Sequence, residues 1–172
     1  MDAQDTVQVR SRADDDLPAL RQLAQDVHAL DGYPPRLPQD LGQFVAAPGA
    51  LASFVATANG QVIGHVCVSP SSSPEVLGLA QQALGVQRKD IAVVARMLVS
   101  PTTRRRGVAR ALLTEAVAEA RRLGRTPILD VATHFTGAIA LYESAGWRRL
   151  GLVSVDISGM EPLDEYVYGE PG

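Results

Sequence analysis

The sequence predicts one domain of the α/β (α+β) class, with helices flanking a mixed sheet. Its 172 residues fit a single domain, and no repeat, linker or low-complexity segment divides them. Asn59-Gly60 joins two β-rich runs and predicts an antiparallel hairpin. Residues 91–133 read as strand, helix and strand, which predicts two parallel strands joined by a right-handed crossover. We therefore expect residues 1–172 to form one domain, with a core at about 7–168.

The first half of the chain is predicted from the spacing of apolar residues and from turn residues. Apolar side chains between Leu17 and Leu30 recur at helical spacing, and the acidic run Asp14–Asp16 favours a helix start before them. The segment DGYPPRLP at residues 31–38 cannot be regular, because it holds three prolines and a glycine. The predicted elements are a strand at Val7–Arg10, a helix at Asp15–Ala29, a short helix near Asp40–Ala47, and hairpin strands at Leu51–Ala58 and Gln61–Ser69.

The second half contains the crossover and two final strands. Ile91–Val99 is an apolar run interrupted only by Arg96, typical of a central strand covered on both faces. The longest helical pattern starts near Val108, and Gly124 suits its C-terminal cap. The predicted elements are a helix at Glu75–Leu84, a strand at Ile91–Val99, the helix from Val108, a strand at Pro127–Thr133, a helix at Gly137–Ser144, and strands at Leu150–Ile157 and Glu165–Tyr168.

Composition and charge exclude several classes of protein. With 46% hydrophobic and 20% charged residues, the chain is not a disordered polyampholyte. Cys67 is the only cysteine, so an internal disulfide is excluded, and no Cys/His spacing indicates a metal site. A net charge of −3 excludes a chain that is basic throughout and coats nucleic acid. The acidic N-terminus does not resemble a signal peptide, and glycines and prolines break the uncharged stretch 41–74, so we expect a cytoplasmic protein without a membrane partner.

An arginine-rich turn, SPTTRRRGVARA at residues 100–111, follows the apolar strand. A glycine at such a turn lets main chain approach a ligand, and the next helix start offers unpaired N–H groups at the positive dipole end. Three arginines, Arg104–Arg106, add positive charge. These features suit a pyrophosphate, although neither GxxxxGK[ST] nor GxGxxG occurs. The residues alone leave open a solvated basic turn in which Gly107 serves only the chain geometry.

Two motifs resemble those of one family. Arg104-x-x-Gly107-x-Ala109 resembles the R/Q-x-x-G-x-G/A motif of the GCN5-related N-acetyltransferases (GNAT), and AIALYESAGW at residues 138–147 is similar to the family's A-x-x-L-Y-x-x-x-G-F/W. Their order and spacing fit, and a predicted strand precedes each. The resemblance implies a mixed, mostly antiparallel sheet whose parallel strands, Val93–Ser100 and Ile128–Thr133, splay apart around acyl-CoA. It also implies transfer of an acetyl group from acetyl-CoA by direct attack of an amine in a ternary complex.

The resemblance assigns a donor site to the first motif. Main-chain groups of Leu98 and Val99 would pair with the pantetheine amides, and main-chain N–H groups from Arg104 to Arg110 would hold the pyrophosphate. Arg105 stands where the family usually has glycine, and either a phosphate contact or exposure to solvent fits it. The implied donor residues are Leu98, Val99, Arg104, Arg105, Arg106, Gly107, Val108, Ala109 and Arg110.

The resemblance also implies a catalytic acid. A tyrosine at the position of Tyr142 protonates the departing CoA thiolate in related enzymes, and the alternative is a tyrosine packed in the core. Gly146 and Trp147 would be a helix stop and an apolar plug. The base stays open, because Ala95 stands where many relatives carry a carboxylate. Asp130, His134 or a water chain are the candidates, and the alternatives are a hydrogen-bonded strand aspartate at 130 and an exposed histidine at 134. No asparagine role transfers to Phe135.

The acceptor site is predicted least directly. In the family the loop after the first helix usually forms one wall, so His28, Asp31, Tyr33 and Arg36 are candidates beside a simple rigid turn. Arg96 is a lone charge in an apolar strand, so we expect it at the strand end facing the cleft or paired with an acid, with an acceptor carboxylate as a possible ligand. The residues predicted to bind the acceptor are Asp31, Tyr33, Arg96 and Asp130.

The charge distribution fits a small anionic donor and an amine acceptor. Eight arginines against two glutamates give residues 96–125 a local charge of +6, while both ends of the chain are acidic. The acceptor is a small-molecule or a protein amine. An acyl-CoA-binding module without turnover is the alternative, and the missing carboxylate at Ala95 favours it. Nucleic-acid binding through Arg104–Arg106 is disfavoured, because only 5% of the residues are aromatic.

Overall fold

The computed structural model describes residues 6–104 and 107–170. The chain forms two compact units, one made of residues 1–68 and 96–119 and the other of 69–95 and 120–172. Among the described residues, no helix combines the length and the apolar composition that crossing a bilayer requires.

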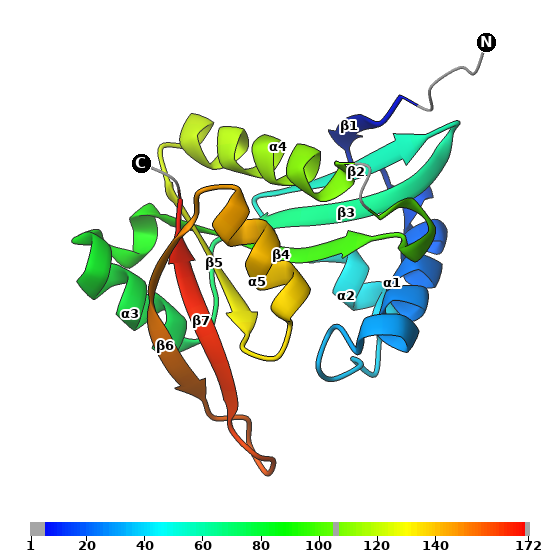
Figure 1. Ribbon diagram of the computed structural model, residues 1–172. Coiled ribbons are helices and arrows are strands. Elements are labelled where there is room, and N and C mark those ends of the chain that lie inside the picture. Colours follow the sequence, from blue (N-terminus) through cyan, green and yellow to red (C-terminus); the bar gives the residue numbers. More distant parts are fainter. Residues whose placement is uncertain (1–5, 105–106, 171–172) are drawn as a thin grey trace. The chain divides into compact units, whose positions relative to one another are not determined.

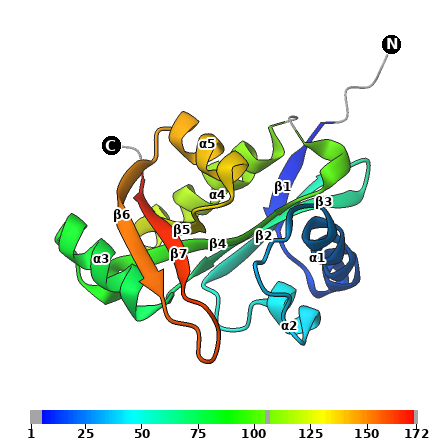
Figure 2. The ribbon, with the colours of Figure 1, turned by 60° about the horizontal axis from the view of Figure 1, so that its bottom comes forward.

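The first unit contains three antiparallel strands and two helices near the N-terminus (Figures 1 and 2). Strands β1 and β2 pair from Gln8↔Thr57 to Ser11↔Phe54, and β2 and β3 pair across the Asn59-Gly60 turn. The predicted hairpin is therefore confirmed. The elements are β1 (Gln8–Ser11), α1 (Leu17–Asp31), α2 (Leu41–Ala46), β2 (Ala52–Ala58) and β3 (Gln61–Ser69), with short 3-10 turns η1 (Asp14–Asp16) and η3 (Pro101–Thr103).

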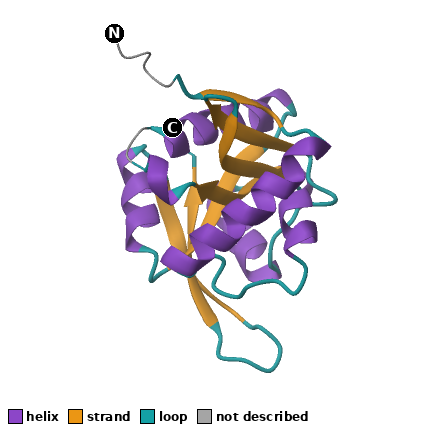
Figure 3. Cartoon of the chain, turned by 90° about the vertical axis from the view of Figure 1, so that its right-hand side faces the viewer, coloured by secondary structure: helices purple, strands orange, loops and turns teal. Residues whose placement is uncertain are grey.

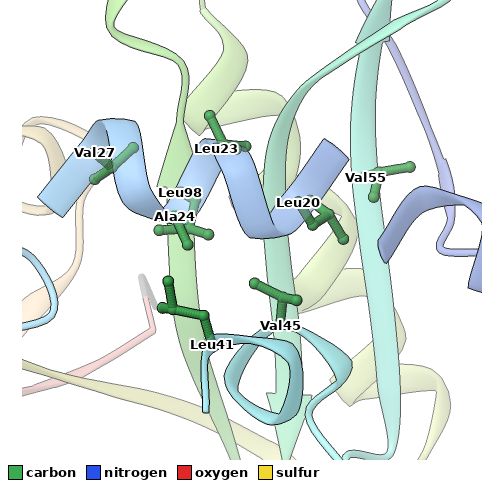
Figure 4. Close-up of a cluster of buried hydrophobic side chains, with 8 residues drawn as sticks. All are labelled: Leu20, Leu23, Ala24, Val27, Leu41, Val45, Val55 and Leu98. Atoms are coloured by element: carbon green, nitrogen blue, oxygen red, sulfur yellow. The ribbon is translucent and has the colours of Figure 1, made fainter. Parts of the chain in front are cut away.

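The core of the first unit lies between α1, α2 and the strands (Figure 4). The apolar spacing predicted for the first helix places four residues of α1 in this core. Gly32 ends α1 in the left-handed conformation, with φ 71°, and its N–H donates to the carbonyl of His28. The buried cluster is Leu20, Leu23, Ala24, Val27, Leu41, Val45, Val55 and Leu98.

Gly64 of β3 allows helix α4 (Val108–Arg122) to approach the strand closely. A Cβ built on Gly64 would lie 2.9 Å from Leu112 Cδ1 and 3.1 Å from both the Leu98 carbonyl oxygen and Val108 Cγ1. These separations are shorter than ordinary van der Waals contacts, so a side chain at position 64 would push the helix away. The start of α4 is thus held against β3 and the end of β4 (Ile91–Val99).

The second unit is built on parallel and antiparallel pairs. Strands β4 and β5 are parallel from Ile91↔Thr126 to Val93↔Ile128, as the crossover predicted. Strand β7 is antiparallel to both β5 and β6, and the loop that joins β6 and β7 extends beyond the strands (Figure 3). Helix α3 packs on β6 and β7. The elements are α3 (Pro74–Leu84), η2 (Arg88–Asp90), β5 (Thr126–Ala132), α5 (Thr136–Ser144), β6 (Arg148–Val155) and β7 (Leu163–Gly169).

Hydrogen-bonded neighbours follow the strand order β1-β2-β3-β4-β5-β7-β6, which is a mixed, mostly antiparallel sheet. The predicted α/β class is therefore confirmed. One detail of the prediction is wrong: Ala95, Arg96 and Met97 are only half-buried, so β4 is not covered on both faces along its whole length. Arg96 also has φ 54°, which breaks the regular strand at that residue.

Candidate active site

The turn after β4 is fixed to the neighbouring strand. The amide of Ser100 donates to the carbonyl of Ile63 over 2.8 Å, and the hydroxyl of Thr103 donates to the carbonyl of Ser100 over 3.1 Å. Gly107 follows with φ 77°, and the space where its Cβ would stand is open. The turn therefore combines an anchored start with main chain that a ligand can approach at Gly107.

Helix α4 begins directly after Gly107. The carbonyl of Gly107 accepts from the amide of Ala111 over 3.0 Å, so Val108, Ala109 and Arg110 precede the first helical hydrogen bond. Val108 is buried and anchors the helix start, while Arg110 is exposed. Helix-start amides and the positive end of a 15-residue helix form a setting that binds anions.

Arg104 of this turn is ion-paired with Asp31 at the end of α1. Both side chains are about one-third exposed, so the pair lies at the surface. Asp31, which we predicted to bind the acceptor, thus lies against the predicted donor turn. Arg105 and Arg106, predicted to contact phosphate, lie outside the described residues.

Tyr142 lies on α5 in the second unit, 8% exposed. Burial and the nearby charge of Asp130 raise the pKa of Tyr142 to about 12, so its phenol keeps its proton throughout the physiological range. The main chain after it turns tightly, because the amide of Trp147 donates to the carbonyl of Tyr142 and Gly146 has φ 88°. Trp147 is buried, as expected of an apolar plug.

A pair of carboxyl groups lies in the same unit. Asp130 of β5 and Glu165 of β7 share a hydrogen bond, and the Ser72 hydroxyl donates to Asp130 Oδ1 over 3.3 Å. Burial raises the pKa of Asp130, and burial together with Asp130 raises the pKa of Glu165 to about 7. Such a pair holds a proton near neutral pH and can give it up or take one.

Arg96 does not lie where we expected it. It stands inside β4 rather than at its end, and its guanidinium contacts α2 rather than an acid: Nη1 donates to the carbonyl of Phe44 over 2.6 Å, and Cζ lies 5.0 Å from the Phe44 ring centroid. The prediction was wrong because a carbonyl at the end of a helix and an aromatic ring can both stabilise a guanidinium.

The remaining candidates have structural partners. Tyr33 packs against the α1–α2 core, and the ring of His28 donates from Nδ1 to the carbonyl of Pro34 over 3.0 Å. His134 is exposed, and its ring lies 4.2 Å from that of Phe135. Cys67 is buried, and burial raises the pKa of its thiol to about 11. The contacts of His28 and the exposure of His134 match the structural alternatives for these two residues.

The model described as the acetyltransferase (GNAT) family matches residues 17–147, which include the anchored turn, α4 and the whole second motif. The chain belongs to the GNAT acetyltransferase family. The expected fold and the resemblance are confirmed, and acetyl-CoA is the acyl donor that this family uses.

Solved structures of GNAT acetyltransferases share the fold of this one. The NAA60 protein of Arabidopsis thaliana in complex with acetyl-CoA is 24% identical, covers 95% of this chain and 97% of its own, and has a TM-score of 0.71. The ribosomal-protein-S18-alanine N-acetyltransferase of Escherichia coli is 23% identical, with coverage of 96% and 94% and a TM-score of 0.68. The yncA protein of Salmonella typhimurium with acetyl-CoA is 19% identical, with coverage of 96% and 93% and a TM-score of 0.70. No curated protein matches significantly.

Two side chains of this GNAT acetyltransferase escaped the sequence prediction. Glu165 was placed in a strand but given no role, because its contact with Asp130 depends on β7 lying beside β5. His65 was read as one residue of a hairpin strand, although its ring contacts Arg96 across 31 positions of sequence. Neither pairing leaves a pattern in one sequence, since both depend on how distant strands align.

Proposed function

We propose that this protein is an acetyl-CoA-dependent N-acetyltransferase in which an amine attacks the thioester directly. The observation that carries the proposal is the turn at Arg104-x-x-Gly107-x-Ala109, which ends in open space at Gly107 and in the amides of a helix start. This turn fits a diphosphate, because backbone N–H groups that a phosphate can approach closely are enough to bind it. Binding of this kind needs neither a metal ion nor a side chain that transfers protons. Acetyl-CoA supplies the acetyl group as a reactive thioester.

In this proposal the turn after β4 and the start of α4 bind the donor. The amides of Val108, Ala109 and Arg110 hold the pyrophosphate, and Arg104 adds positive charge beside them. Main-chain groups of Leu98 and Val99 pair with the pantetheine amides, as the family motif implies. Arg105 and Arg106 are further candidates by sequence alone.

Tyr142 and the Asp130–Glu165 pair are the residues proposed for the proton transfers. The Tyr142 phenol, protonated at neutral pH, donates to the sulfur that leaves. An amine must lose its proton to attack, and the Asp130–Glu165 pair is the proposed acceptor, with Glu165 titrating near neutrality. This pair stands in for the carboxylate that Ala95 does not provide.

The acceptor is an amine, either of a small molecule or of a protein. Relatives with the same fold include an enzyme named for alanine of ribosomal protein S18, so a protein N-terminus belongs on the panel of acceptors to be tried. Asp130 is the proposed contact to the amine, and Tyr33 and Arg96 are retained as candidates at the acceptor side. The cytoplasmic location and the single-domain organisation stay predictions.

Isothermal titration with acetyl-CoA, followed by a free-thiol assay over small amines and N-terminal peptides, tests the proposal. Saturable binding and amine-dependent thiol release support it, while absence of acetyl-CoA binding would overturn it. An acyl-CoA-binding module without turnover is the second candidate, because Ala95 replaces the carboxylate seen in many relatives. Binding without thiol release for any amine would favour that module.

A further inference from the structure

His65 of β3 is a buried histidine that the proposed reaction does not use. It has 0% of its surface exposed and lies opposite Val55 of β2, whose side chain belongs to the α1–α2 core. Burial and the charges of Arg12 and Arg96 lower the pKa of His65 to about 4, so the ring is neutral at physiological pH.

The hydrogen bond of His65 defines its tautomer. Nδ1 lies 2.9 Å from the carbonyl oxygen of Arg96, and a carbonyl only accepts, so Nδ1 carries the proton. Nε2 is then an acceptor, and among the described residues it is buried without a hydrogen-bond partner. An apolar side chain of similar size would not bury an unpaired Nε2, so it would avoid that cost. The advantage of a histidine at position 65 is therefore its hydrogen bond to the Arg96 carbonyl.

Arg96 holds a backbone conformation that needs support. Its φ of 54° lies in the left-handed region, which costs free energy for a residue with a Cβ. Among the described residues, Ala47 and Asn59 also have positive φ, but Ala47 caps a helix and Asn59 lies in a hairpin turn. Arg96 alone of the three stands within a strand, and its main chain is fixed by His65 while its side chain is fixed by the Phe44 carbonyl.

The segment after Arg96 is anchored at both ends. His65 holds the carbonyl of Arg96, and the carbonyl of Ile63 holds the amide of Ser100 over 2.8 Å. Between these anchors, Leu98 is buried in the α1–α2 core, which fixes the direction of its side chain and hence of its peptide groups. Both anchors come from β3, two residues apart.

We propose that His65 is a positioning residue for the acyl donor: its bond to the Arg96 carbonyl sets the left-handed break in β4 and thereby aims the main-chain groups of Leu98 and Val99 at the pantetheine amides. This inference rests on the proposed function. His65 contacts no reacting atom and acts through the Arg96 main chain.

Three variants separate this role from simple packing. His65→Leu keeps the volume and removes the donor. His65→Asn keeps an N–H at nearly the position of Nδ1. Cys67→Ala, two residues along the same strand, disturbs the same buried region but keeps the hydrogen bond from His65 to Arg96, and it is the matched control.

Isothermal titration with CoA should show about tenfold weaker binding for His65→Leu, which corresponds to about 1.4 kcal/mol. His65→Asn should stay within about threefold of the wild type, and Cys67→Ala should bind unchanged. Hydrogen exchange without ligand should be faster at residues 97–99 in His65→Leu alone. Wild-type CoA affinity in a folded His65→Leu protein, or equal losses in His65→Leu and Cys67→Ala, would overturn the proposal.

If His65→Leu fails to fold, a double variant keeps the proposal testable. Glycine takes the left-handed conformation without cost, so adding Arg96→Gly to His65→Leu should restore folding and CoA binding if strain at Arg96 is what His65 opposes. A double variant that stays unfolded contradicts the proposal. Failure of the wild type to bind CoA would instead count against the proposed function, and the exchange rates at 97–99 would still report on the His65 bond.

Discussion

Tyr142 joins two properties that a hydrogen-bond donor to a leaving sulfur needs. Its phenol is nearly buried, and its pKa of about 12 keeps it protonated at any pH where the protein is used. The Glu143–Arg149–Tyr168 hydrogen bonds fix the next residue of the helix, because Tyr168 and Arg149 both donate to Glu143 Oε1 over 2.9 and 2.8 Å. The helix that carries Tyr142 is thus braced against β6 and β7.

Tyr142→Phe should lower kcat by about 100-fold or more while the Kd for CoA changes less than about threefold, because only the donated proton is lost. Thiol release under saturating acetyl-CoA measures the first quantity, and titration calorimetry measures the second. Tyr166→Phe, which removes a hydroxyl from a β7 tyrosine that stacks on Arg149, serves as the comparison. Full turnover in Tyr142→Phe would show that the Tyr142 hydroxyl takes no part in the reaction.

Glu165 makes stability depend on pH in a defined direction. The folded state raises the pKa of Glu165 from 4.5 to about 7, so it keeps a proton that the unfolded chain releases. The contribution of Glu165 to the free energy of unfolding is fully present below about pH 4.5 and is lost as the pH rises through 7. Relative to Glu165→Gln, the wild type should therefore lose free energy of unfolding between pH 4.5 and 7.

Urea unfolding at several pH values measures that difference. The exposed Glu115 of α4 offers a matched Glu→Gln variant, measured over the same pH range. A wild-type minus Glu165→Gln difference that is flat from pH 4.5 to 7 would show that Glu165 titrates normally.

At the scale of elements, the close approach of α4 to β3 sets where the donor turn lies. Gly64→Ala should move the start of α4 by a few tenths of an ångström and lower the free energy of unfolding by about 1–3 kcal/mol. It should also weaken CoA binding, because the new Cβ would press on the main chain at Leu98. Gly78→Ala on α3, where a Cβ meets nothing, should be neutral or stabilising. Thermal unfolding and CoA titration check both variants. Unchanged CoA affinity in Gly64→Ala would show that the contact between α4 and β3 does not influence the donor site.

Elements that rest on local patterns were predicted closely. Ile91–Val99 has the predicted bounds because an apolar run stops at Pro101, and the hairpin has its predicted turn because Asn59-Gly60 permits only a few conformations. The break at Arg96 was not predicted, since it depends on a histidine of another strand. Asp130 was one candidate for the base, beside His134 and a water chain, because it lies on the predicted strand. Glu165 could not be named with it, because only the strand order brings β7 beside β5.

At the scale of the whole molecule, a net charge of −3 coexists with a basic segment. Residues 96–125 carry +6, and the described part of that segment includes the helix start proposed to bind the diphosphate. Local charge, not the total, governs a ligand that binds within a few ångströms.

Binding of CoA should therefore weaken steadily with salt although protein and ligand are both anionic. Between 0.1 M and 1 M salt the screening length falls from about 10 Å to about 3 Å. Titration calorimetry at these two concentrations should show a higher Kd in 1 M salt, and dephospho-CoA should show a smaller change. Salt-independent affinity would place the phosphates away from the arginines.

The buried thiol of Cys67 has a consequence for steady-state kinetics. With its pKa raised to about 11, the chain's one cysteine is neither ionised nor reachable, and it cannot carry an acetyl group between half-reactions. In the proposed direct attack of the amine, both substrates are present before either product leaves. Double-reciprocal plots against acetyl-CoA at several amine concentrations should intersect rather than run parallel, and parallel lines would mean that some other side chain holds the acetyl group in transit.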